Sequence, residues 1–206
     1  MLERTMMQDD GINIYTGNDQ NLVSIYGVNE YRYHAWWHAS LTTSDQLRQR
    51  MAWALSQIFV VNDDDGFLND SELDNNGEPL FLGSTYYYDL MINNAYGNYP
   101  DLLRQVSMSP LMGRFLSHVN NPKPEPAANL FPDENYAREI MQLFSIGLHE
   151  LNIDGTFRTD INGNLIDSYN NETIKTMARV FTGWHFATRD FWYYEPVFSL
   201  PMIFDN

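Results

Sequence analysis

The chain has 206 residues and a formal net charge of −15, with 27 acidic residues against 12 basic ones. An acidic surface of this kind repels nucleic-acid phosphates and anionic lipids, so nucleic acid is excluded as an expected partner. The chain contains no cysteine, which excludes disulfides, thiolate metal sites and cysteine nucleophiles.

Apolar residues make up 44% of the chain, which is enough to build a core. A chain of this length buries roughly 70% of its unfolded surface, so we expect residues 1–206 to form a single helical domain. No stretch approaches the ~20 apolar residues that cross a bilayer, and no membrane span is expected. The last six residues, PMIFDN, contain neither a helix stop nor a polar tail. This ending indicates that the sequence is an excerpt of a longer chain. The missing remainder of that chain is then an expected partner of residues 1–206.

The first helix is predicted to begin near Thr43 and to end near Val60. The first thirty residues have no clear periodicity and are expected to form loops with at most short strands. Thr43 and Gln46 have the spacing of a capping box. Apolar residues then recur at helical spacing and predict the face toward the core, which consists of Leu47, Met51, Ala54, Leu55 and Ile58.

Three further helices are predicted in the middle of the chain, after a polar loop over residues 62–79. Thr85 can cap a helix that runs to about Ala95. Pro100 suits the first turn of the next helix, and Ser109-Pro110 begins another one. Their inward residues are predicted to be Leu102, Leu103, Val106, Leu111, Phe115 and Leu116.

Two more helices complete a compact all-α bundle of about six helices with long Asp/Asn-rich loops. The clearest one opens at Pro132-Asp133, and the last one runs from Asn171 to Gly183. Between them, Asn162-Gly163 can close one short hairpin, since positive φ costs little there. The predicted apolar stripes are Tyr136, Ile140, Leu143, Phe144 and Leu148 in the former helix, and Ile174, Met177, Ala178 and Phe181 in the latter.

The helix that opens at Asp133 carries the candidate catalytic residues Glu134, Arg138, Glu139 and, at its end, His149. Two carboxylates near an arginine can have separated pKa values, as acid/base catalysis requires. One interpretation is a polar cleft in which Glu134 or Glu139 acts as acid or base. The other is a surface ion pair with a network that fixes helix packing. No glycine-rich phosphate loop is present, so no nucleotide cofactor is expected.

The loop after the first helix offers a candidate calcium site. Asp63, Asp65, Gly66 and Glu72 fall on the third, fifth, sixth and twelfth positions of an EF-hand loop. Val61 occupies the first position, where an aspartate is expected. Calcium bound by Asp63, Asp65 and Glu72 is therefore one interpretation, and a solvated polar loop is the other.

Aromatic residues are abundant, at 15% of the chain, and two clusters stand out: Tyr86-Tyr87-Tyr88 and Phe191-Trp192-Tyr193-Tyr194. Exposed rings of this kind can stack on sugar rings or anchor a protein partner, whereas buried rings fill the core. A protein partner or an extracellular polymer is accordingly the expected binding partner.

Several blocks of the chain stand out: DQLRQR (45–50), ALSQIF (54–59), NAYGNY (94–99), MGRFLS (112–117), PDENYAREIMQLF (132–144) and ARVFTGW (178–184). Together they resemble the bacterial family catalogued as domain of unknown function 1800. The resemblance implies a helical fold and export from the cell, to the periplasm or beyond, and brings no established activity. We therefore expect an exported structural or binding module, stabilised by calcium if the loop site binds it, and the alternative is a hydrolase-like enzyme.

Overall fold

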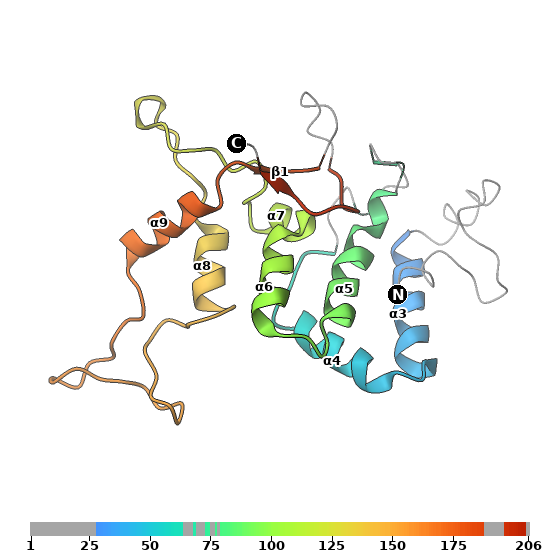
Figure 1. Cartoon of the computed structure of the whole chain (residues 1–206), viewed down its shortest axis with the longest axis horizontal. Helices are drawn as coiled ribbons and strands as arrows, with labels where there is room; N and C mark the ends of the chain where they lie inside the picture. The colour runs from blue at the N-terminus through green and yellow to red at the C-terminus, as the bar shows by residue number, and fades with distance from the viewer. Residues whose placement is uncertain are drawn as a thin grey trace. The chain divides into compact units, whose positions relative to one another are not determined.

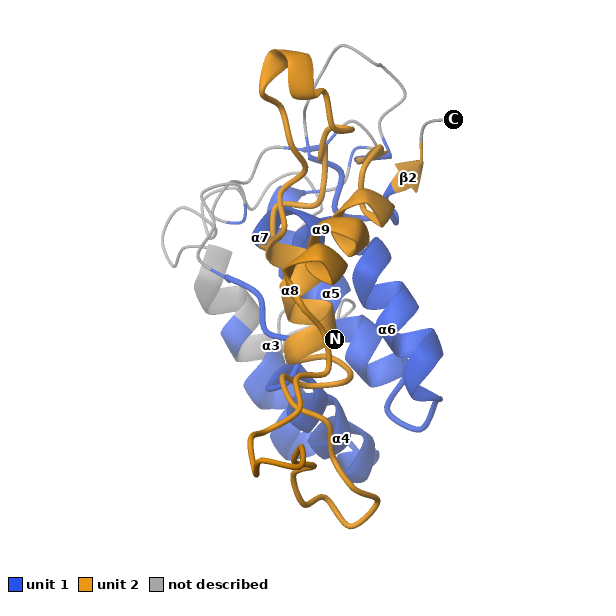
Figure 2. Cartoon of the chain, turned by 90° about the vertical axis from the view of Figure 1, so that its left-hand side faces the viewer, with its two compact units in different colours: residues 1–115, 186–202 blue, residues 116–185, 203–206 orange. Residues whose placement is uncertain are grey.

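The computed structural model describes residues 28–63, 68, 73–74, 77, 79–187 and 196–204; within it, the side chains of residues 28–32 and 34–35 are not described. The chain divides into two compact units, Met1–Phe115 with Phe186–Met202, and Leu116–His185 with Ile203–Asn206 (Figure 2). We describe each unit by itself, and the single domain expected from the sequence stays a prediction.

Helices dominate the described part of the chain, which confirms the predicted all-α class. Seven α-helices lie within it, against about six expected. The first unit holds five of them, together with the 3₁₀ helix η2 at Leu80–Leu82 (Figure 1). These five are α3 (Val28–Thr42), α4 (Gln46–Ser56), α5 (Gly83–Asn93), α6 (Tyr99–Met108) and α7 (Pro110–Phe115).

The second unit contains helices α8 (Asn135–Gln142) and α9 (Asn171–Val180) and the 3₁₀ helix η3 (Pro126–Ala128). Strand β1 (Trp184–His185) pairs with β2 (Ile203–Phe204) in antiparallel register. In neither unit does a described helix combine the length and the hydropathy that a bilayer crossing requires.

Helix α5 forms the centre of the first unit's core. Its Tyr87 is buried, and the Tyr87 hydroxyl donates a 2.8 Å hydrogen bond to the carbonyl oxygen of fully buried Phe59. The prediction that Thr85 caps this helix is wrong. Thr85 is fully buried inside α5, and the N-cap residue is Leu82. At α6 the prediction that Pro100 lies in the first turn is confirmed. The structure adds a cap, because the Asn98 side chain accepts from the backbone N–H of Asp101.

The predicted inward face of α4 is wrong. Leu47 is 67% exposed, and Met51, Ala54 and Ile58 are exposed as well, whereas Gln49 and Ala52 are buried. The periodicity correctly predicts a helix with an apolar stripe, but the stripe does not face the core of its own unit. The capping box is also absent: the Gln46 amide donates to the Thr43 carbonyl, and no side chain caps α4.

The second unit packs around a buried ring cluster. His118 stacks on Tyr136 with 3.9 Å between ring centroids, and Phe181 meets Tyr136 edge-on at 4.8 Å. Buried Asn121 accepts from the Asp133 backbone N–H and donates to the Asp133 carbonyl, which fixes the chain just before α8. Of the predicted α8 stripe, Tyr136, Ile140 and Phe144 are buried, while Leu143 and Leu148 are exposed because the helix ends at Gln142.

Helix α9 and its neighbouring turns follow the sequence prediction closely. The Asn170 side chain caps α9 by accepting from the Thr173 backbone N–H, and Ile174 and Ala178 face the core. The predicted hairpin turn is present before it: the Asp160 N–H donates to Asn164 O, and Gly163 has a φ of +84°.

Gly83→Ala tests how tightly α5 is packed. A Cβ at this position would lie 2.8 Å from both Leu68 Cδ2 and Phe198 Cγ, so neighbouring side chains must move. We expect the free energy of unfolding, measured by urea denaturation, to fall by about 1–3 kcal/mol. Gly97→Ala is the matched control, because its Cβ would meet nothing closer than 3.4 Å. Equal stability of the two variants would contradict the close packing.

Candidate functional site

Aromatic side chains from three helices of the first unit surround a hollow of about 470 Å³, which we call the aromatic hollow. Helix α3 contributes two tryptophans, α4 a third, and α5 two tyrosines. Ser56, Gln57, Asp63 and Ser84 supply polar groups to its lining. The aromatic lining includes Tyr33, Trp36, Trp37, Trp53, Tyr87 and Tyr88.

The rings of the aromatic hollow differ in how far they are accessible. Trp37 is 57% exposed and Trp53 is 49% exposed, whereas Tyr87 is buried. The Trp36 and Trp37 rings meet edge-on with 4.8 Å between centroids. Burial raises the pKa of the Tyr88 hydroxyl, and the charge of Asp89 beside it acts in the same direction, so this hydroxyl stays protonated at neutral pH. The hollow thus presents flat apolar ring faces together with the hydrogen-bonding groups of Tyr88, Ser56, Gln57, Ser84 and the acidic residue Asp63.

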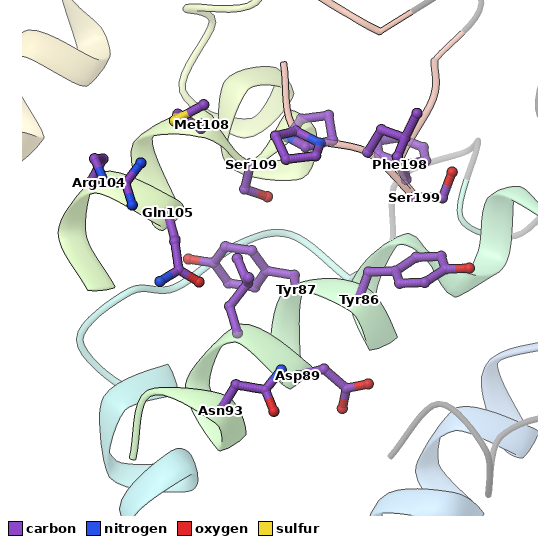
Figure 3. A pocket seen from close by; sticks show the side chains of 14 residues that line it. Tyr86, Tyr87, Asp89, Asn93, Arg104, Gln105, Met108, Ser109, Phe198 and Ser199 are labelled. Carbon is purple, nitrogen blue, oxygen red and sulfur yellow. The ribbon is translucent and has the colours of Figure 1, made fainter. Parts of the chain in front are cut away.

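A second hollow of about 380 Å³ lies in the same unit between α5, α6 and residues 198–201, and we call it the α5–α6 hollow (Figure 3). Its charged residues are Asp89 on α5 and Arg104 on α6. Tyr87 lines both this hollow and the aromatic hollow. One buried side chain therefore forms part of the wall of each.

The predicted catalytic residues of α8 lie in the second unit. Glu134 and Arg138 form an i, i+4 ion pair with 2.7 Å between Oε2 and Nη2, and the side chains of both are partly exposed. Glu139 is half-buried, and its Oε2 is buried with no hydrogen-bond partner among the described residues. The structure thus brings Glu134 and Arg138 together, as expected for residues one helical turn apart.

His149 lies beyond α8, in a segment over residues 148–168 that we call the arm. Its Nδ1 is 3.1 Å from Oδ1 of Asp167, and Arg158 pairs with Glu150 beside it. No hydrogen bond or ion pair in the described parts of the chain joins His149 to Glu134, Arg138 or Glu139. The predicted catalytic set is therefore divided between a helix pair and the arm.

The arm is built from three short backbone segments that pair in a cycle. Glu150 N–H donates to Ile166 O, Ile166 N–H to Arg158 O, and Arg158 N–H to Glu150 O. Two similar turns, eight residues apart, connect the segments: NIDG at 152–155 and DING at 160–163. The glycine of each turn has a φ above +80°, which L side chains rarely adopt.

Two carboxylates of the arm, those of Asp154 and Asp160, accept hydrogen bonds from groups in its turns. Oδ1 of Asp154 accepts from the backbone N–H and the hydroxyl of Thr156, and these bonds lower the Asp154 pKa. Oδ1 of Asp160 accepts from the backbone N–H groups of Asn164 and Asn162, and bonds from Asn164 are the largest cause of its lowered pKa. These acidic side chains therefore shape the backbone locally.

The predicted calcium loop is only partly visible. Asp63 lines the aromatic hollow, while Asp65 and Glu72 lie outside the described residues. Over the ranges that are described, no three His, Asp or Glu side chains form a group that could hold a metal ion. Calcium binding by Asp63, Asp65 and Glu72 stays a prediction.

The turns of the arm should open on acidification. A carboxylate whose folded pKa is depressed stabilises the fold above its unfolded pKa, and that contribution is lost as pH falls through the folded value. We expect the Thr156 amide proton to titrate with an inflection below 3.8, the ordinary value for Asp154, in a pH series of NMR spectra. Asp154→Asn keeps the acceptor oxygen and should abolish the inflection. An inflection at or above 3.8 in the native chain would contradict the hydrogen bonds that Asp154 accepts from Thr156.

Comparison with known proteins gives one match. No curated protein and no solved structure is significantly similar to the chain. A family model described as "Protein of unknown function (DUF1800)" matches residues 25–201, which is most of the sequence, and confirms the resemblance found in the sequence blocks. The chain belongs to the family of proteins of unknown function DUF1800.

Proposed function

We propose that the protein is an exported binding module whose aromatic hollow takes the sugar rings of an uncharged extracellular polysaccharide. The observation that carries this proposal is the convergence of Trp36, Trp37 and Trp53 with Tyr33 on one hollow. Large aromatic rings are normally buried, and an exposed apolar group of this size marks a binding surface.

The chemistry of the lining suits a pyranose ring. Such a ring presents C–H groups on its faces and hydroxyl groups around its edge. Indole and phenol rings provide broad apolar surfaces for the faces and lose little conformational entropy on binding. The side chains of Ser56, Gln57 and Asp63 lie in the same lining, and they supply donors and acceptors for the hydroxyl groups.

Charge narrows the class of polymer. The net charge of −15 disfavours polyanions such as acidic polysaccharides, nucleic acids or anionic lipid surfaces. Among the lining residues that the structure describes, none is a lysine or arginine that could pair with a carboxylate or sulfate group. An uncharged glycan is not repelled by the negative charge of the chain, and it needs no cationic side chain to pair with. Export to the periplasm or the cell exterior, where such polymers occur, rests on the family resemblance.

Trp37→Ala and Trp53→Ala test this proposal. Each variant removes one exposed stacking ring, and the association constant for neutral oligosaccharides, measured by isothermal titration calorimetry, should fall about tenfold or more. Phe131→Ala is the matched control, because Phe131 is 59% exposed and lies in the other unit. It should bind as the unaltered chain does.

Two outcomes would overturn the proposal. One is that a panel of uncharged glycans, covering α- and β-linked glucans and chitin oligomers, gives no binding heat with the unaltered chain. The other is that binding occurs but does not change in Trp37→Ala or Trp53→Ala. Binding of a protein and of no glycan would assign the hollow to a protein partner instead.

A hydrolase-like enzyme centred on α8 is the second candidate, and one observation favours it. The buried Oε2 of Glu139 has no hydrogen-bond partner in the described part of the chain, so it keeps its capacity to accept a proton or a hydrogen bond. Structural networks normally satisfy such an atom. The test is whether the chain releases reducing ends from a glycan. If it does, and if Glu139→Gln abolishes that release, the protein is an enzyme and not only a binding module.

A further inference from the structure

The α5–α6 hollow contains a cation that the rest of the described chain does not neutralise. Arg104 lines this hollow and forms no hydrogen bond or ion pair with any residue that the structure describes. Three other arginines are held by groups of the chain itself: Arg48 donates to the Ile92 carbonyl, and Arg138 and Arg158 pair with glutamates. Arg104 lies at an exposed position of α6, so a ligand can reach its guanidinium. Its planar guanidinium offers a fork of donors that matches a carboxylate.

The walls of the hollow are mostly apolar. Leu90 comes from α5 and Met108 from α6, while Phe198 and Pro201 come from the segment that closes the third side. Figure 3 shows Arg104, Gln105 and Met108 on one helix and Tyr86, Tyr87, Asp89 and Asn93 on the other, with the hollow between them. Its volume of about 380 Å³ lies within the usual range of roughly 300–1,000 Å³ for small-molecule sites.

The second charge of the hollow has the opposite sign and comes from the opposite helix. Asp89 lines the α5 side, whereas Arg104 lines the α6 side. A ligand with a carboxylate alone would meet Arg104 favourably and Asp89 unfavourably. A ligand with a carboxylate at one end and an ammonium group at the other complements both charges, and an apolar body would fill the space between the apolar walls.

We propose that the α5–α6 hollow binds a free amino acid with a bulky apolar side chain. The carboxylate lies on the Arg104 guanidinium, the ammonium group lies toward Asp89, and the side chain packs against Leu90, Met108 and Phe198. This inference concerns a different hollow and a different ligand class from the proposed polysaccharide site, so either can fail without the other.

The test measures binding of L-leucine, at millimolar concentration, to the full chain by isothermal titration calorimetry. We expect saturable binding that weakens at least about tenfold in Arg104→Met, because a charge-assisted hydrogen-bond pair is lost while most of the stem remains. Arg179→Met, at an exposed position in α9, is the matched control and should leave the dissociation constant unchanged. 4-Methylpentanoate, which lacks the ammonium group, should bind more weakly than leucine to the unaltered chain.

Asp89→Asn tests the role of the negative charge independently of Arg104. It should remove the preference for leucine over 4-methylpentanoate, and circular dichroism verifies that the variant stays helical. If Asp89→Asn unfolds, the comparison of the two ligands on the unaltered chain still decides the role of the ammonium group. The proposal is overturned by the absence of leucine binding, by unchanged binding in Arg104→Met, or by 4-methylpentanoate binding as tightly as leucine.

Discussion

The first unit depends on where α5 lies, and one buried hydrogen bond fixes it. The Tyr87 hydroxyl donates to the carbonyl oxygen of Phe59, just past the end of α4, and both residues are buried. Leaving a buried carbonyl without its donor costs about 1–3 kcal/mol, so this bond strongly favours one arrangement of the two helices. One turn earlier, α5 begins with Gly83, whose missing side chain leaves room for Leu68 and Phe198. These two contacts hold the N-terminal half of the helix.

Both hollows follow from this placement. Tyr87 lines the aromatic hollow and the α5–α6 hollow alike. The neighbouring Tyr88 lines only the first hollow and Tyr86 only the second, as successive residues of one helix point in different directions. A run of three tyrosines therefore lines two hollows with different chemistry: one lined by aromatic rings, and one mostly apolar with one charge on each side.

The sequence predicted the parts of the fold that depend on local signals. Pro100 in the first turn of α6 and the start of α9 at Asn171 were both predicted, because such signals act on backbone groups within their own turn. The caps Asn98 and Asn170 were not predicted, although they are local signals of the same kind. The sequence did not predict which face of α4 is buried. Periodicity reveals an apolar stripe, but not what covers it, and here Gln49 and Ala52 are buried instead of Leu47. Helix α3 was missed altogether, since its tryptophans and tyrosines do not follow a clear amphipathic stripe.

The candidate site was predictable only in part for the same reason. Tyr87 and Tyr88 attract attention as a run, whereas Trp37 and Trp53 come from separate helices and meet only in the folded chain. The partner of His149 was missed similarly: Asp167 lies eighteen residues downstream, and the two turns of the arm bring it back. Those turns did carry a signal, the near-repeat of NIDG and DING at eight-residue spacing, which predicts two similar reversals of the chain.

The central claim is that sugar rings stack on the tryptophans of α3 and α4. The most direct measurement follows the indole N–H signals of the ¹⁵N-labelled chain while a neutral oligosaccharide is added. Trp184, in strand β1 of the other unit, provides an internal reference. The account predicts that the signals of Trp36, Trp37 and Trp53 shift in a saturable way while that of Trp184 stays in place. Saturable binding that leaves those three signals unmoved would contradict it.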